Sequence, residues 1–296
     1  MNFIKLQTLS LSRKIIYRKT LHINVLCSML NHGSSQVHTT ASINKQEIIS
    51  KALVKEISKL SATVKLLKLE IKDDKFSFKA GQWVDMFIPG VPVVGGFSIC
   101  SPPHLLQASR MLHLAIKYSN HPPAHWAHTQ CKVGDSLHLR AGGKFVYDPD
   151  PVTPCSDLVL IAGGVGINPL FCILHHFLHV HNLQRDSNLK GTSKVVLLYS
   201  AQSPDELIFL NELLLLSENY DNVTIKFFST KERVKEDHFI TNGRIHYQVL
   251  ESILKDTGLT KGQVYICGPL SFIETMEVYS KDAGFSRDCI FIERWW

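Results

Sequence analysis

The pattern of hydrophobic and polar residues divides the chain into two parts with different periodicity. Between about residues 48 and 147, apolar positions alternate or run together briefly in segments rich in β-branched and aromatic residues. Turns containing glycine and proline separate these segments, which predict strands at residues 63–71, 83–88, 97–100, 112–118 and 137–139. A short helix is expected at residues 124–131. Regular short strands of this kind are typical of an antiparallel barrel or sandwich.

A proline-rich segment, DPDPVTP at residues 148–154, marks the change of pattern. After it, strand-like segments at residues 158–162, 195–200, 223–228 and 263–267 alternate with helix-like segments at 169–181, 206–217, 247–255 and 271–283. This alternation predicts a doubly wound parallel sheet. We therefore expect a β-barrel domain at residues 47–150 and an α/β domain at residues 151–296, after a separate segment at residues 1–46.

The first strand of the α/β part leads into a glycine-rich turn and a helix that proline opens. Glycines let the backbone approach a bulky anion, and Pro169 suits the first helical turn because its missing N–H costs nothing there. The free N–H groups and the helix dipole favour a phosphate at this point. An ordinary strand-to-helix turn is the alternative. The candidate cofactor-binding residues are Gly163, Gly164, Val165, Gly166, Ile167, Asn168 and Pro169.

Ligands of open α/β sheets bind outside the carboxyl ends of the strands. Small or polar residues stand at four predicted strand ends, namely residues 163–168, 200–201, 229–231 and 267–269. Together they predict a ledge wide enough for a dinucleotide.

The net charge of +6 on the 296 residues comes from the N-terminal segment. Residues 1–46 contain six of the 32 Lys and Arg residues and no Asp or Glu, whereas the remainder is balanced, with 26 residues of each sign. A basic, acid-free segment with interleaved apolar and hydroxyl residues is typical of a mitochondrial presequence, so a matrix location is expected. A secretory signal and a disordered basic tail are the alternatives. The balanced remainder argues against a nucleic-acid-binding face, and no apolar window is long enough to span a membrane.

The cysteines and histidines do not predict a metal site. The seven cysteines are scattered and include no C-x-x-C pair, which argues against a disulfide framework, a zinc site or an iron–sulfur cluster. His175 and His179 share a helix face, but no carboxylate or cysteine joins them at ligand spacing. Surface or packing histidines are expected instead.

Several motifs occur in the order and spacing of one known family. They are GGFSICS at residues 95–101, VGD at 133–135, GGKF at 142–145, GGVGINP at 163–169, CGP at 267–269 and FIERWW at 291–296. With the antiparallel half placed before the α/β half, the chain resembles the ferredoxin–NADP reductase superfamily over nearly everything after about residue 50. That resemblance implies a flavin-binding β-barrel joined to a nicotinamide-binding α/β domain.

The resemblance also implies roles for individual residues. In the barrel, Phe97 would lie against the isoalloxazine ring and Ser98, as a catalytic residue, would hydrogen-bond near flavin N5. Ile99 and Ser101 would present backbone to the flavin. Lys117 and the turn at residues 121–126 would lie near the flavin phosphates.

In the α/β domain, residues 163–169 would hold the pyrophosphate of the nicotinamide cofactor. Cys267, as the second catalytic residue, would line the nicotinamide pocket together with Gly268 and Pro269. Glu293 and Trp296 would close over the flavin. Packing roles in the core or at the surface are the alternatives for Phe97, Cys267 and Trp296.

Two positions depart from the family's Arg-x-Tyr-Ser pattern. Gly95 stands where the arginine pairs with a flavin phosphate, and Phe97 keeps the aromatic face of the tyrosine without its hydroxyl. NAD is expected rather than NADP because residues 200–202 contain no arginine, although Lys231 and Arg233 leave NADP open.

The predicted function is a flavin-dependent oxidoreductase. NAD(P)H would donate hydride to a bound flavin, expected to be FAD, and electrons would pass to an unidentified acceptor. A nicotinamide-binding redox sensor without flavin turnover, or a structural subunit of a mitochondrial assembly, is the alternative.

Overall fold

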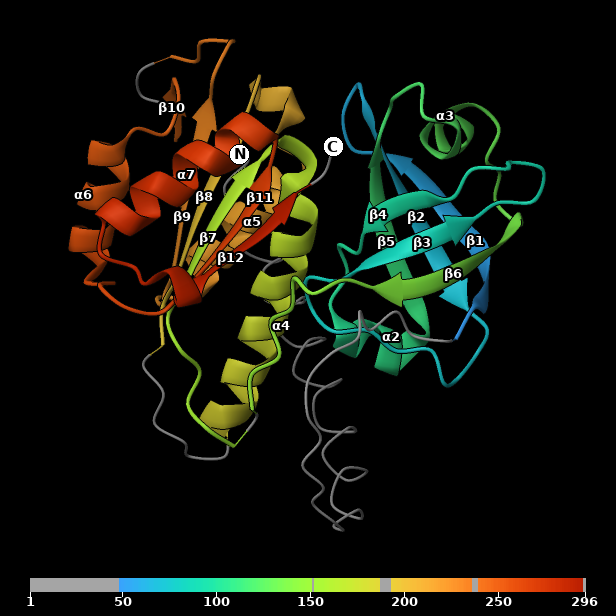
Figure 1. Ribbon diagram of the computed structural model, residues 1–296, viewed down its shortest axis with the longest axis horizontal. Coiled ribbons are helices and arrows are strands. Elements are labelled where there is room, and N and C mark those ends of the chain that lie inside the picture. The colour runs from blue at the N-terminus through green and yellow to red at the C-terminus, as the bar shows by residue number, and fades with distance from the viewer. Residues whose placement is uncertain (1–47, 151, 187–192, 236–238, 295–296) are drawn as a thin grey trace, which may run out of the picture. The chain divides into compact units, whose positions relative to one another are not determined.

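The computed structural model describes residues 48–150, 152–186, 193–235 and 239–294 (Figure 1). These residues belong to one compact unit, residues 43–296. We name residues 48–150 the barrel lobe and residues 152–294 the α/β lobe. Residues 1–46, with the predicted presequence, and Trp296 lie outside the described residues. Within the described part, no helix is both long and apolar enough to cross a membrane.

Six antiparallel strands form the sheet of the barrel lobe, in the order β4-β3-β6-β1-β2-β5. Buried residues alternate with exposed or half-buried ones along much of β1 and β2, as expected when one face of a sheet packs on a core. The strands are β1 (Ser50–Lys59), β2 (Val64–Ile71), β3 (Trp83–Phe87), β4 (Gly95–Ser98), β5 (Met111–Lys117) and β6 (Ser136–Gly142).

The two edges of this sheet meet and close it as a barrel. Ile99, directly after β4, forms a bridge with Leu114 of β5, and the Cys100 N–H donates to the carbonyl of His113 at 3.0 Å. Two short helices, α2 (Pro103–Ser109) and α3 (Pro122–Thr129), lie on either side of β5 in the chain. The predicted antiparallel barrel is confirmed; β1 and α2 were not predicted.

The α/β lobe contains six parallel strands in the order β10-β9-β8-β7-β11-β12. They are β7 (Leu158–Gly163), β8 (Val195–Ala201), β9 (Val223–Ser229), β10 (Ile240–Asn242), β11 (Gln263–Gly268) and β12 (Ile290–Arg294). The chain order reverses between β7 and β11, which is the switch point where open sheets of this class bind ligands. The predicted doubly wound sheet is confirmed, with β10 and β12 as unpredicted outer strands.

Helices cover both faces of this sheet. Residues of α4 (Ile167–Asp186) and α5 (Leu210–Asn219) share a core with Leu158, Leu160 and Ala162 of β7. Residues of α6 (Tyr247–Thr257) and α7 (Leu270–Asp282) pack with the alternate positions Val159 and Ile161. Every residue of β7 is buried, as expected for a central strand covered on both faces.

One predicted helix begins later than its sequence suggested. Residues 206–217 were expected to be helical, but Pro204–Glu206 form a short 3₁₀ turn and α5 begins at Leu210. Between them, Phe209 adopts a left-handed conformation with φ of 62° and stacks on Phe171 of α4 at 4.2 Å between ring centroids. The contact of Phe209 with Phe171, which lies outside the predicted helix, therefore accompanies a backbone turn that helix propensity did not predict.

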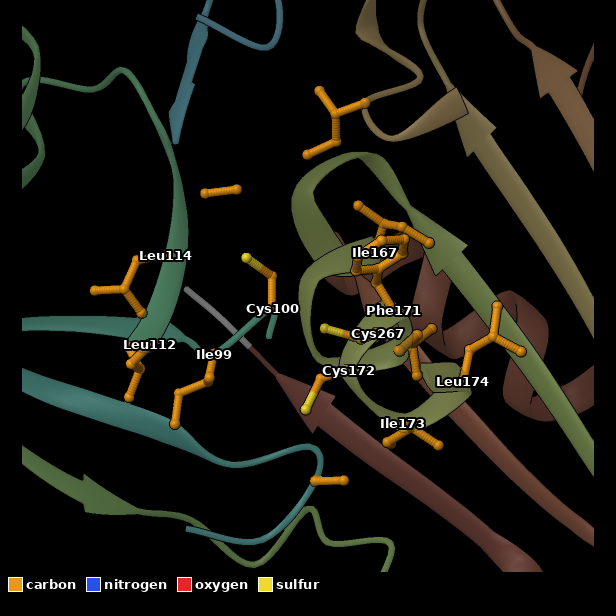
Figure 2. Close-up of a cluster of buried hydrophobic side chains, with 14 of the residues drawn as sticks. Ile99, Cys100, Leu112, Leu114, Ile167, Phe171, Cys172, Ile173, Leu174 and Cys267 are labelled. Carbon is orange, nitrogen blue, oxygen red and sulfur yellow. The ribbon is translucent and has the colours of Figure 1, made fainter. Parts of the chain in front are cut away.

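The two lobes share a continuous apolar core (Figure 2). Ile99 and Leu114 of the barrel belong to the same cluster as Ile167, Phe171 and Ile173 of the α/β lobe. The predicted domain division near residue 150 falls between the two sheets, in the segment that joins β6 to β7. Because the lobes share this core and form one compact unit, a division into independent domains stays a prediction.

Candidate functional site

In the glycine loop between β7 and α4, Gly164 borders open space and Gly166 packs closely on the backbone of β11. Gly164 has a left-handed φ of +55°, and a Cβ built there meets nothing within 4 Å. A Cβ on Gly166 would lie 2.3 Å from the carbonyl oxygen of Cys267. Gly164 therefore faces free space, whereas Gly166 lets the loop pack directly on the end of β11.

The ends of β7 and β11 approach each other closely at the switch point. A Cβ on Gly268 would lie 3.1 Å from the Cα of Gly163 and 2.9 Å from the ring of Phe272. A Cβ on Gly163 would lie 3.0 Å from both Phe272 and Pro269. Phe272 therefore lies against both strand ends, a contact that the sequence alone did not indicate because only its position in an amphipathic helix was visible.

The start of α4 faces the barrel lobe. The side-chain amide of Asn168 donates to the carbonyl of Ala115 in β5 at 2.7 Å, and Ile167, Asn168 and Pro169 are all buried. The Asn168 Oδ1 atom is buried without a hydrogen-bond partner among the described residues. The structure thus places the second half of the predicted loop against the barrel, while Gly164 and the half-buried Val165 remain partly accessible.

Cys267 and Glu293 are paired in register on neighbouring strands β11 and β12. Cys267 is fully buried, and burial raises the pKa of its thiol, so the group stays protonated at neutral pH. Burial also raises the pKa of the half-buried Glu293 carboxyl, to about 7. A carboxyl with this pKa exchanges its proton near neutral pH, which is the property of a group that donates or accepts protons.

Ser98 lies at the end of β4 and is buried. Among the residues that the structure describes, its hydroxyl has no hydrogen-bond partner, and neither has the Glu293 carboxyl. Phe97, beside it, is half-buried. The Ser98 oxygen keeps some solvent exposure, so water or a ligand can satisfy it.

A short path of contacts connects these two polar groups. Ile99, next to Ser98, bridges Leu114, and the neighbouring Ala115 accepts from Asn168. Two residues before Asn168, Gly166 packs on the carbonyl of Cys267, whose strand partner is Glu293. Packed residues therefore connect Ser98 of the barrel lobe to Glu293 of the α/β lobe, but the two side chains do not contact each other.

Ile99 and Ser101 form hydrogen bonds within the barrel and to α4. The Ile99 N–H donates to the carbonyl of Gln82 at 3.0 Å. The Ser101 hydroxyl accepts from the His113 N–H at 2.9 Å, and the Ser101 carbonyl accepts from the Cys172 thiol at 3.1 Å. Their predicted backbone contacts with a flavin stay a prediction.

Lys117 forms an ion pair across the two lobes. Its Nζ lies 3.3 Å from Oε2 of Glu206, which follows β8. The same carboxylate accepts from the Ser61 hydroxyl at 2.8 Å and from Thr63. We call this group, made of Ser61, Thr63, Lys117 and Glu206, the lobe clasp. Sequence analysis missed Glu206 because its partners are remote in the chain.

The predicted strand ends lie side by side at the carboxyl edge of the sheet, where Gly163 pairs with Ser200 and Ala201 with Ser229. That a dinucleotide binds along this edge stays a prediction. The loop after β9 is fastened to the end of β8, since the Lys231 and Glu232 N–H groups both donate to the Gln202 carbonyl. Lys231 Nζ also lies 3.1 Å from Gln202 Oε1.

The histidines of α4 are packing residues. His179 stacks on His104 of α2 at 4.1 Å between ring centroids, and His175 lies 3.3 Å from a carboxylate oxygen of Glu212. Within the described ranges, no group of three or more His, Cys, Asp or Glu residues is placed to hold a metal.

Comparison with known proteins identifies the α/β lobe. Residues 160–277 match the family model of the oxidoreductase NAD-binding domain. The chain is 44% identical over 272 residues to oxidoreductase NAD-binding domain-containing protein 1 of Xenopus tropicalis, covering 89% of this chain and 84% of the relative. The human protein of the same name is 41% identical over 272 residues, with 89% and 85% covered.

Solved structures share the fold at low identity. A ferredoxin–NADP reductase from Neisseria gonorrhoeae, solved with bound FAD and NADP, superposes with a TM-score of 0.65 at 19% identity and covers 83% of this chain and 98% of that one. The arrangement of a barrel before an NAD-binding α/β lobe is therefore that of the ferredoxin–NADP reductase fold, as the sequence motifs predicted.

Proposed function

The chain belongs to the oxidoreductase NAD-binding domain-containing protein 1 family, and from that premise we propose that it is an NAD(P)H-dependent oxidoreductase that reduces a flavin. Electrons would then pass to a separate acceptor. The glycine loop at the switch point carries this proposal. Gly164 faces open space directly beside the strand ends where open sheets bind ligands.

The described residues fit a nicotinamide dinucleotide. The open space beside Gly164 leaves room for a pyrophosphate next to the backbone N–H groups at the start of α4, whereas Gly163 and Gly268 let the two strand ends and Phe272 pack closely. Cys267 and Gly268 at the end of β11 would hold the nicotinamide end. The fully buried Cys267 thiol, which stays protonated, would lie behind this strand end without acting as a nucleophile, and the exposed Pro269 would be the residue nearest the ligand.

The residues of the barrel suit the isoalloxazine ring of a flavin but suit its phosphates poorly. The half-buried Phe97 and the unpartnered Ser98 hydroxyl offer an aromatic face and a hydrogen-bond donor. When both groups are bound, the nicotinamide supplies a hydride and the flavin ring accepts it. Ser98 would position the ring, and the Glu293 carboxyl would hold a proton near the site at neutral pH.

NAD is proposed as the preferred dinucleotide. Gln202 directly follows β8, where an arginine would recognise a 2′-phosphate, and the Lys231 ammonium near this point is already engaged by Gln202 Oε1 at 3.1 Å. We expect kcat/KM to be higher for NADH than for NADPH. The Gln202→Arg variant should move that ratio towards NADPH by about tenfold; an unchanged ratio would place the adenosine ribose elsewhere.

Binding of NADH to the full chain tests the proposal, measured by titration calorimetry. Gly164→Asp places a carboxylate in the open space and should abolish binding by repelling the pyrophosphate. Gly284→Asp is the matched control, because Gly284 also has a positive φ and free space but precedes β12 at the opposite end of the sheet. Equal affinity in both variants would exclude this loop as the dinucleotide site.

A nicotinamide-binding redox sensor is the second candidate, favoured by the poor fit of flavin phosphates to the barrel. It predicts NADH binding without NADH oxidation in the presence of any flavin. A structural subunit of a mitochondrial assembly predicts neither. Steady-state NADH oxidation with added flavins, measured beside the binding titration, separates the three.

We also propose import into mitochondria, supported by the basic, acid-free composition of residues 1–46. A fluorescent protein fused after residue 46 should accumulate in the mitochondrial matrix, and replacing Arg13, Lys14, Arg18 and Lys19 by Gln should abolish this. A fusion that enters the secretory pathway would contradict the proposal.

A further inference from the structure

We propose that the barrel lobe binds flavin by its ring alone and takes it as a diffusible substrate, rather than keeping FAD as a resident cofactor. The inference rests on the proposed function and specifies the substrate of that same site. It follows from three features that lie together where β4, α3 and the end of β5 meet, and that concern the recognition of phosphate.

The first feature is the filled space at residue 95. A Cβ on Gly95 would lie 2.5 Å from Cε2 of Phe97 and 2.6 Å from Cβ of Pro123. The ring of Phe97 and the first turn of α3 therefore occupy the volume that a side chain at this position needs. No cation extends from β4 at this point towards a phosphate.

The second feature is the start of α3. Helix N-termini bind phosphate through free N–H groups, but the first two helical residues here are Pro122 and Pro123, which have none. The His121 cap makes no side-chain hydrogen bond to the helix, and Ala124 alone among the first three helical residues retains an N–H. The helix thus lacks most of the donors that hold an anion.

The third feature is the engagement of the nearest lysines. Lys117 Nζ is held in the lobe clasp by Glu206, and Lys65 Nζ donates to the carbonyl of His128 near the end of α3 at 2.7 Å. A phosphate beside Lys117 would also face the Glu206 carboxylate, which opposes its binding. Engaged lysines, missing N–H donors and filled space therefore all oppose a phosphate at this junction.

This site should consequently distinguish poorly between riboflavin, FMN and FAD, which share the isoalloxazine ring and differ in phosphates. The reaction is balanced with two substrates. Hydride leaves C4 of NAD(P)H and adds to N5 of the oxidised flavin, and one proton, given by the Glu293 carboxyl and replaced from solvent, adds to N1. The products are NAD(P)⁺ and a dihydroflavin, which dissociates.

The test uses the full chain, gel-filtered after purification, with riboflavin, FMN and FAD as added acceptors for NADH. We expect substoichiometric flavin after filtration and kcat/KM values for the three flavins within about threefold, a difference in binding free energy of well under 1.4 kcal/mol. Stoichiometric FAD that survives filtration and is bleached by NADH would overturn the inference and leave the proposed function standing.

Two other outcomes are also decisive. A preference for FMN or FAD over riboflavin of about tenfold or more would show phosphate recognition and overturn the inference. NADH oxidation with none of the three flavins would overturn the proposed function itself.

A gain-of-function pair tests the geometry. Phe97→Leu combined with Pro123→Gly removes both groups that fill the space at residue 95, and Gly95→Arg added to this pair places a cation there. The triple variant should prefer FAD over riboflavin by about tenfold relative to the pair alone, through one charge-assisted contact. An unchanged ratio would show that residue 95 does not face the flavin tail and would remove the basis of the inference.

Lys117→Met provides an independent measurement. Because Lys117 is committed to Glu206, its loss should alter the kcat/KM for riboflavin and for FAD by the same factor. A selective loss with FAD would identify Lys117 as a phosphate ligand and contradict the inference.

Discussion

Glu206 of the α/β lobe accepts hydrogen bonds from Thr63 of the barrel lobe, with the hydroxyl oxygen 2.7 Å from its Oε2 and 2.9 Å from its Oε1. The loop that carries Glu206 begins at the end of β8, on the ledge where a dinucleotide is proposed to lie. The Glu206 carboxylate therefore links the loop after β8 to the turn between β1 and β2 of the barrel.

Removing the charge of Glu206 should destabilise the protein. Glu206→Gln leaves Lys117 without its partner and weakens the contacts of Ser61 and Thr63, at a cost of about 1–3 kcal/mol. Urea unfolding at pH 7 measures this, with Glu218→Gln on the exposed side of α5 as the control, expected within about 0.5 kcal/mol of the parent. A loss no larger than that of the control would contradict a stabilising role for the clasp.

The same carboxylate predicts acid sensitivity of the clasp. Burial alone raises the pKa of Glu206, but hydrogen bonds from Thr63, Ser61 and Lys117 outweigh it and hold that pKa below its ordinary value. Because the folded pKa is depressed, the contribution is present above the unfolded value of about 4.3 and is lost as pH falls through the folded pKa. The difference in unfolding free energy between the parent and Glu206→Gln should therefore become smaller as the pH falls below about 4.3.

Gly166 should tolerate a methyl group far less well than Gly164. Alanine at 166 places Cβ 2.3 Å from the Cys267 carbonyl oxygen, so β11 or the loop must move, at a cost of about 1–3 kcal/mol. Alanine at 164 meets free space and experiences only the left-handed backbone, about 1 kcal/mol. Urea unfolding of the two alanine variants measures both losses of unfolding free energy. Equal losses would mean that the loop does not pack on β11.

Three half-buried histidines should make the free energy of unfolding fall on mild acidification. Burial, aided by nearby His179, lowers the pKa of His104 to about 3, and burial lowers those of His113 and His176 to about 4. The unfolded chain therefore binds more protons between about pH 6.5 and 4, and unfolding becomes easier as pH falls through that window.

Between pH 6.5 and 4.5, the free energy of unfolding should fall by about 1–2 kcal/mol less in His104→Gln than in the parent. His138→Gln, an exposed site on β6, is the control and should leave the slope unchanged. Equal slopes for parent and His104→Gln would mean that His104 is already protonated in the folded protein.

Glu293 should impose its own pH dependence on flavin reduction. Its carboxyl pKa is raised to about 7 by burial, so the protonated form that can donate is lost as pH rises through about 7. We expect kcat/KM for NADH oxidation to decline across that range and the inflection to vanish in Glu293→Gln. Glu274→Gln, which changes an exposed carboxylate on α7, should keep the inflection. If the inflection persists in Glu293→Gln, another group causes it.

Hydrophobic periodicity was sufficient to predict both sheets, since residues that alternate or run apolar must be buried on one face or on two. It failed for β1, where charged residues such as Lys55 and Glu56 interrupt the pattern, and for the outer strand β12, which is only partly covered. Edge strands bury less apolar surface, so the pattern in the chain is weaker there.

The glycine loop and the order of the motifs were determined by the sequence itself, because a tight turn before a helix and a close backbone approach require particular residues in a row. Only the tertiary structure decided where Lys117 and Phe97 point. Lys117 meets a carboxylate that lies 89 positions away in the chain, and Phe97 covers the space beside Gly95 because α3 packs there. Local patterns specify which face is buried; the partner of a charged or aromatic side chain depends on which distant elements the fold brings beside it.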